Sequence, residues 1–232
     1  MRNIRDIHSE KRGGKRPVIS FEFFPPKTET GIENLFNKTA PALSELRPDF
    51  ISVTYGAGGS TRSKTLDIAQ RVQNELDLPA LLHLTCVNAT AADIGQVVED
   101  AKARGISNIL ALRGDPPSGG EFEKTEGGFE FSYQLIEFLK EKGDFCIGTA
   151  GFPEGHVACK DGKQIDWDHL CHKLTAARTL WSLSCFSTIE TSLSSATTYF
   201  ENLVERSPSP WGFSRSFQGN RFVVSPSCVA QN

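Results

Sequence analysis

Ser20-Phe21-Glu22-Phe23-Phe24-Pro25-Pro26 is the first strand-like run of the sequence. Apolar and aromatic residues dominate residues 18–24, which is typical of a buried strand, and the two prolines end it. Glu22 lies inside this apolar run. Because an unpaired buried charge costs several kcal/mol, we expect this carboxylate to be paired, neutralised or engaged in chemistry. A structural ion pair and a catalytic acid both fit this position.

Strand-like and helix-like segments alternate after this run. We expect strands at 17–24, 50–54, 81–87, 106–112 and 145–150, and helices at 31–46, 65–76, 91–104, 132–142 and 165–173. This alternation predicts a parallel sheet with right-handed crossovers. An open doubly wound sheet and a (β/α)8 barrel both have that pattern.

Polar side chains favour the barrel. They lie in or just beyond the C-terminal halves of successive strands, and they are Glu22, Thr54, His83, Arg113 and Asp115. The C-terminal strand ends of such a barrel converge on one mouth, where these folds place their chemistry. Five strands are too few to close a barrel. The predicted fold class is therefore an α/β, (β/α)8 TIM barrel that is incomplete, with about five βα units.

Each polar feature also has a structural interpretation. The loop Tyr55-Gly-Ala-Gly-Gly-Ser-Thr61 could cradle a phosphate or could be a tight βα turn, and it lacks the dinucleotide and Walker A spacings. His83 could be a core histidine, and His156 an exposed loop residue. Arg113 and Asp115 could form a local ion pair. Only as a set do these residues indicate a site.

Composition narrows the classes of protein. The 232 residues are 38% hydrophobic, enough for one core, and the net charge of -3 does not favour nucleic acid or anionic membrane as a partner. We expect residues 1–16 to be a basic N-terminal extension, solvated and frayed. Neither a membrane-spanning run nor a signal peptide is recognisable. The six cysteines form no CxxC pair, which predicts reduced thiols in a cytoplasmic protein without a metal site.

Five motifs occur in order along residues 17–173. They read Ser20-Phe-Glu-Phe-Phe-Pro-Pro26, Ser52-Val-Thr-Tyr-Gly-Ala57, His83-Leu-Thr-Cys86, Ala111-Leu-Arg-Gly-Asp-Pro-Pro117 and Phe152-Pro-Glu-Gly-His156. Together they resemble methylenetetrahydrofolate reductase of the bacterial type. The resemblance implies a (β/α)8 barrel that carries FAD and uses NADH or NADPH. It also implies reduction of 5,10-methylenetetrahydrofolate to 5-methyltetrahydrofolate in one-carbon and methionine metabolism, and possible homo-oligomers at full length.

The resemblance also assigns roles to residues. Glu22 matches the acid that protonates N10 of the folate, so that the five-membered ring opens to an iminium that a flavin hydride can attack. This needs a carboxyl group still protonated near neutral pH, which burial between phenylalanines would favour. Asp115 matches an aspartate near the flavin and the pterin. The other matching positions contact the flavin, its nucleotide arm or the nicotinamide, and are Thr54, Tyr55, Ala57, His83, Arg113, Gly114, Phe131, Ser132, Phe152, His156, Asp166, His169 and Lys173.

Phe131 and Phe152 depart from the family pattern, which often has tyrosine at both positions. Phenylalanine keeps the aromatic stacking surface and loses the hydroxyl hydrogen bond.

The composition changes after Lys173. Residues 174–232 contain 12 serines and six threonines but neither lysine nor aspartate. One interpretation is a disordered Ser-rich tail. Our hypothesis is a one-nucleotide frameshift near Lys173, because the shifted codons of residues 178–192 permit D-F-V-V-S-Q-L-F-F-D-N-R-D-F-F, which is similar to the family's sixth strand and next helix. We therefore treat residues 174–232 as an aberrant tail.

Three functional hypotheses remain open at this point. The first is the flavin-dependent folate reductase. The second is an inactive truncated fragment with at most residual flavin binding or association with an intact subunit. The third is an unrelated barrel lyase that uses Glu22 and Arg113 on a phosphorylated substrate.

Overall fold

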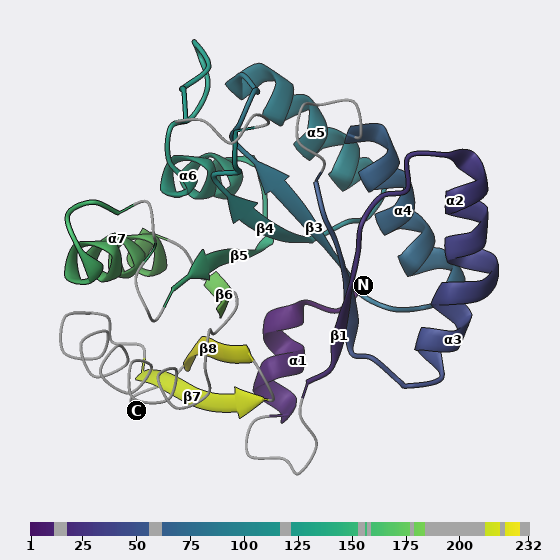
Figure 1. Ribbon diagram of the computed structural model, residues 1–232. Coiled ribbons are helices and arrows are strands. Elements are labelled where there is room, and N and C mark those ends of the chain that lie inside the picture. The colour runs from purple at the N-terminus through teal and green to yellow at the C-terminus, as the bar shows by residue number, and fades with distance from the viewer. Residues whose placement is uncertain are drawn as a thin grey trace.

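The computed structural model of the chain describes residues 1–11, 18–55, 62–116, 122–152, 156, 159–176, 179–183, 212–218 and 221–227, with side chains up to residue 170. Its strands form one sheet of eight in the order β1-β2-β3-β4-β5-β6-β8-β7 (Figure 1). The parallel strands are β1 (Ser20–Phe23), β2 (Phe50–Val53), β3 (Ala80–Thr85), β4 (Asn108–Leu112), β5 (Cys146–Gly151) and β6 (Thr179–Leu183). The antiparallel strands are β7 (Gly212–Gln218) and β8 (Arg221–Ser227).

The predicted incomplete barrel is confirmed. The five expected strands form in order and pair in parallel, while β1 and β7 stand at opposite ends of the strand order, so the described strands do not close into a ring. Two features go beyond the expectation. β6 adds a sixth parallel strand after Lys173, and β7 and β8 form an antiparallel pair within residues 174–232.

Helices cover the outer face of the sheet (Figure 1). They are α2 (Glu29–Asn34), the π-helical turn η1 (Leu35–Thr39), α3 (Ala40–Ser44), α4 (Arg62–Glu75), α5 (Ala91–Ala103), α6 (Ser132–Lys142) and α7 (Lys163–Ala176). Capping explains two of the starts: Thr28 Oγ1 accepts the Gly31 N–H, and Thr90 and Asp93 form a reciprocal capping box. The expected helix 31–46 is interrupted by η1, which ends two residues before Pro41, a residue with no N–H to donate to the preceding turn.

Strand alternation divides the apolar residues between two faces. The larger core cluster lies under the helices and includes Ile51, Leu82, Ile109 and Ile147, whose exposed fractions are 2% or less. The opposite, inner face carries a second cluster made by Phe50, Leu81, Leu110 and Cys146. The sheet is therefore apolar on both faces near the N-terminal ends of its strands.

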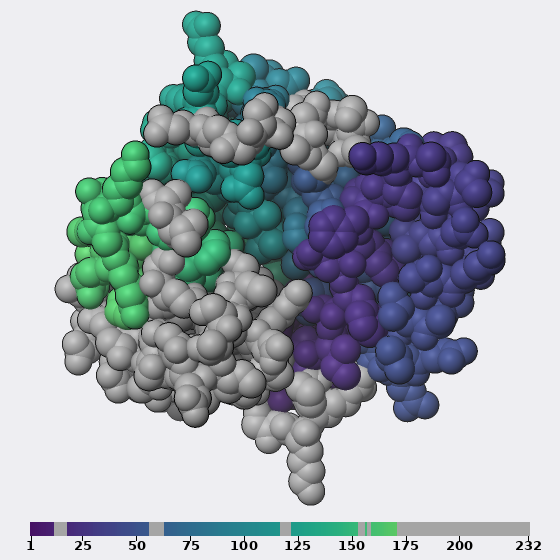
Figure 2. Space-filling view, in the orientation of Figure 1, coloured from purple at the N-terminus to yellow at the C-terminus, as the bar shows by residue number. Residues whose placement is uncertain are grey.

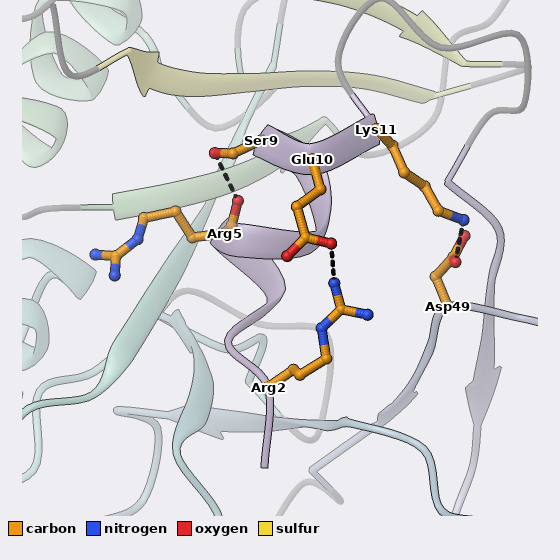
Figure 3. A network of polar contacts seen from close by, with 6 residues as sticks. All are labelled: Arg2, Arg5, Ser9, Glu10, Lys11 and Asp49. Atoms are coloured by element: carbon orange, nitrogen blue, oxygen red, sulfur yellow. Dashed lines mark hydrogen bonds and ion pairs between the residues drawn. The ribbon is translucent and has the colours of Figure 1, made fainter.

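The N-terminal helix α1 (Ile4–Lys11) covers that second cluster. Ile4 and Ile7 are buried in it, and Asn108 Oδ1 accepts the Ile4 N–H at 2.9 Å, which satisfies one of the free donors of the first helical turn. Ion pairs join Arg2 to Glu10 and Lys11 to Asp49 (Figure 3). The expectation of a frayed N-terminus was wrong for residues 4–11. The isoleucines, at i and i+3, form an apolar stripe that the sequence-level count of basic charges overlooked.

Candidate active site

Three polar side chains from neighbouring strands meet on the inner face, above the cluster that α1 covers. They are Glu22 on β1, Ser52 on β2 and His83 on β3. Ser52 Oγ lies 3.2 Å from Glu22 Oε2, and His83 Nε2 lies 3.5 Å from the same oxygen. In the space-filling view the centre of the molecule is recessed between the purple segment that carries β1 and the teal and green segments (Figure 2).

The expectation that Glu22 is buried between phenylalanines was wrong. Its side chain is 30% exposed, whereas Phe23 is 4% exposed. The reason is strand alternation: Phe21 and Phe23 face the helices, and Glu22, between them, faces the open side of the sheet. Ser52 and His83 are more buried than Glu22, with exposed fractions of 3% and 8%. Glu22 can therefore reach a ligand from a polar, half-covered position.

The end of β2 supplies the next predicted residues. The Thr54 N–H donates to the Phe23 carbonyl at 2.9 Å, and the Thr54 carbonyl accepts the Thr65 hydroxyl at 3.2 Å, so α4 holds this strand end. Tyr55 is partly buried against the larger core. Ala57 and the rest of the candidate phosphate loop, residues 56–61, lie outside the described residues.

The Arg113-Gly114-Asp115 turn after β4 requires its glycine. Gly114 has φ of +82°, and a Cβ there would lie 2.8 Å from Val87 Cγ1. The Arg113 carbonyl accepts the N–H groups of Cys86 and Val87, both at 3.1 Å, and its guanidinium lies 5.1 Å from the ring centre of Phe122. Asp115 is exposed. Within the described part of the chain, Arg113 pairs with an aromatic ring and no ion pair to Asp115 is seen.

Aromatic side chains mark the start of α6. Phe131 is 42% exposed, and its ring stacks on that of Tyr133 with 5.8 Å between centroids and 14° between planes. Gln134 Oε1 accepts the N–H groups of Glu130 and Phe131, which fixes the chain entering the helix. Ser132 is buried at the first helical position. The start of α6 thus presents a flat, partly exposed aromatic surface.

A second aromatic group links β5 to α7. The rings of Phe152 and His156 meet edge to face at 4.5 Å, the His156 N–H donates to Asp166 Oδ2 at 3.0 Å, and Trp167 Nε1 donates to the Phe152 carbonyl at 3.3 Å. His169 is exposed on α7. Lys173 lies on the same helix, but its side chain is outside the described part.

The structure thus brings the predicted residues together in small groups and adds three that sequence reasoning missed. Ser52, Phe122 and Trp167 contact Glu22, Arg113 and Phe152, respectively. A signal existed only for Ser52, a lone polar residue inside the apolar strand Phe-Ile-Ser-Val. The other two pairs depend on loop paths that residue patterns do not specify.

Chemically, the groups suit an organic cofactor. Among the described residues, no cluster of three or more His, Cys, Asp or Glu side chains could hold a metal ion. Cys86 and Cys146 are buried, and burial raises the pKa of the Cys146 thiol. Aromatic faces at the start of α6 and before α7, a guanidinium and a polar acid are instead the contacts that a flat ring system with an anionic arm needs.

The family model for methylenetetrahydrofolate reductase matches residues 6–186. The chain belongs to the methylenetetrahydrofolate reductase family. Matched family sequence therefore extends beyond Lys173, through β6. Of the described helices, none is long and apolar enough to cross a membrane.

Relatives in plants and bacteria are named as methylenetetrahydrofolate reductases. The chain is 46% identical over 157 residues to methylenetetrahydrofolate reductase (NADH) 1 of Zea mays, covering 66% of this chain and 26% of that one. It is 39% identical over 159 residues to 5,10-methylenetetrahydrofolate reductase of Escherichia coli, covering 68% of this chain and 51% of that one. The chain thus spans between a quarter and about half of the length of these relatives.

Solved structures share the fold at low sequence identity. The TM-score is 0.56, with 9% identity, to a 2,3-dimethylmalate lyase of the PEP mutase/isocitrate lyase superfamily, covering 85% of this chain and 67% of that one. It is 0.53, with 14% identity, to an uncharacterized Clostridium thermocellum protein that binds two copies of 5-methyl-5,6,7,8-tetrahydrofolic acid, covering 84% and 64%. At these identities the likeness concerns the fold alone.

Proposed function

We propose that the chain takes part in reducing 5,10-methylenetetrahydrofolate to 5-methyltetrahydrofolate, with FAD and a reduced nicotinamide. The observation that carries this proposal is the position of Glu22 on the inner face, with Ser52 and His83 at its Oε2 atom, in a chain of the methylenetetrahydrofolate reductase family. The family match supports a folate substrate and a nicotinamide co-substrate. The maize and Arabidopsis relatives are named for NADH, which favours NADH over NADPH.

Glu22 would act as the acid. Opening the five-membered ring of the substrate breaks the bond between the methylene carbon and N10, and the proton that N10 gains comes from the Glu22 carboxyl group. The methylene carbon, still bound to N5, then receives a hydride and becomes the methyl group. A positioned proton donor typically contributes a rate factor of about 10² to 10⁴.

FAD, when bound, would carry the hydride from the nicotinamide to the folate carbon. The exposed ring of Phe131 and the partly buried ring of Phe152 would stack against its aromatic groups, and Arg113 would face its anionic arm. The exposed Asp115 would lie near the ring system and the pterin. Thr54, Tyr55, Ala57, His83, Gly114, Ser132, His156, Asp166, His169 and Lys173 complete the proposed contact set.

Half-reactions test the assignment. Purified chain is reconstituted with FAD, and the loss of oxidised-flavin absorbance is followed with NADH; reoxidation by methylenetetrahydrofolate is followed separately. Glu22→Gln should slow reoxidation by the folate at least about 10²-fold and leave reduction by NADH largely intact. Equal loss in both half-reactions would show that Glu22 is not the acid.

A second candidate is a flavin-binding fragment without turnover. It is favoured by the open sheet, because β1 and β7 stand at opposite ends of the strand order and the recess is walled on fewer sides than in a closed barrel. Retained flavin colour without reoxidation by folate would support this candidate. Association with an intact subunit, homo-oligomers and a cytoplasmic location also remain predictions.

A further inference from the structure

Ser52 is the polar residue of an otherwise apolar strand. Its neighbours Ile51 and Val53 are both fully buried in the larger core, so strand alternation places Ser52 on the inner face. There it stands directly opposite Glu22 in the β1–β2 register and is 3% exposed. A buried hydroxyl needs hydrogen-bond partners, because leaving one unmade costs stability.

Two acceptors lie within reach of this hydroxyl. Ser52 Oγ is 3.2 Å from Glu22 Oε2 and 3.5 Å from the Phe21 carbonyl oxygen. A serine hydroxyl has one hydrogen to donate and lone pairs to accept. It can donate to Glu22 when the carboxyl group is ionised. When the carboxyl group is protonated at Oε1, Oε2 is a carbonyl oxygen and still accepts the hydrogen bond from Ser52.

The same arrangement leaves one carboxyl oxygen open. His83 Nε2 also approaches Oε2, at 3.5 Å. In the described part of the chain, neither a hydrogen bond nor an ion pair engages Oε1 of Glu22. With both neighbours on Oε2, the orientation of the carboxyl group is defined, and Oε1 takes no part in these contacts.

We propose that Ser52 is a positioning residue for Glu22, holding Oε2 in both protonation states so that Oε1 meets the nitrogen that receives the proton. This rests on the proposed function only for the identity of that nitrogen. The contact between Ser52 and Glu22 can be tested on the protein without cofactor or substrate.

The first measurement is the carboxyl ¹³C resonance of Glu22 at fixed pH, in protein labelled at the glutamate side-chain carboxyl carbon and assigned by its disappearance in Glu22→Gln. Ser52→Ala should move this resonance, and Ser52→Thr, which keeps a hydroxyl, should restore it. The matched control is Thr149→Val. Thr149 is another strand hydroxyl, 1% exposed, which alternation places with Ile147 on the helix-covered face, so its replacement should leave the resonance unchanged.

The second measurement is the pair of half-reactions. Ser52→Ala loses one hydrogen bond to a charged group, which should slow flavin reoxidation by folate about tenfold and leave flavin reduction by NADH unchanged. Ser52→Thr should recover the rate of reoxidation. An unmoved Glu22 resonance in Ser52→Ala would overturn the inference, whatever the activity. A moved resonance with Glu22→Gln still fully active would instead reject the proposed function and leave the contact established.

Discussion

Replacing His8 with phenylalanine should remove a large part of the acid sensitivity of the fold. His8 lies on α1, 8% exposed, with its ring edge-on to Phe50 at 6.3 Å. Burial lowers the pKa of His8 from 6.5 to about 4; the Asp49 carboxylate opposes that shift and Lys11 adds to it. The neutral ring is therefore the form that fits beneath the sheet.

The sign and size follow from proton binding to the two states. Between the two pKa values the unfolded chain is protonated at His8 while the folded chain is not, so acid favours unfolding. The stability gained by keeping His8 neutral is complete above about pH 6.5 and is lost as the pH falls toward 4. The unfolding free energy lost relative to neutral pH is about 2 kcal/mol at about pH 5 and about 3 kcal/mol at about pH 4.

Urea unfolding followed by circular dichroism at several pH values measures this. His8→Phe keeps an aromatic ring against Phe50 and carries no titratable group, so its free energy of unfolding should fall less steeply with acid than that of the wild type. Any constant offset from altered packing does not affect that slope. His169→Gln, at an exposed position on α7, is the control and should follow the wild type. If the free energy of unfolding falls equally steeply with acid in the wild type and in His8→Phe, the reasoning is refuted.

Four further substitutions test the packing by the same unfolding measurement. Gly114→Ala should lower the free energy of unfolding by about 2 kcal/mol or more, because its methyl group would lie 2.8 Å from Val87. The control is Gly105→Ala, also at positive φ but with nothing within 4 Å, which should lower it by about 1 kcal/mol. Equal losses in the two variants would contradict the clash. Asn108→Ala should cost about 2 kcal/mol and speed amide exchange in α1, since it removes the acceptor of the Ile4 N–H; unchanged exchange would count against that tether. Thr149→Val should stabilise by about 1 kcal/mol, because in the described structure the buried hydroxyl has no hydrogen-bond partner; a loss would show that one exists.

Much of the fold can be predicted from local sequence patterns. The period of strands and helices depends on neighbours along the chain, so the order of elements and the helix-facing core follow from residues such as Ile51, Leu82 and Ile109. The limits of α6 agree with the expectation at both ends, residues 132 and 142. The five motifs likewise identify the family, because their residue types at strand ends are specific in combination.

Other features depend on contacts between segments far apart in sequence. The sequence predicts a basic, solvated N-terminal segment. In the structure α1 is held against the sheet, because Asn108, more than a hundred residues away, accepts the first N–H of the helix. Glu22 reads as buried because phenylalanines flank it, yet alternation turns it to the open face. Which side chains meet it there is set by strand register, so Ser52 and His83 become its neighbours only when β1, β2 and β3 pair. Residue types and element order were thus determined locally, and the arrangement of the acid was decided by tertiary pairing.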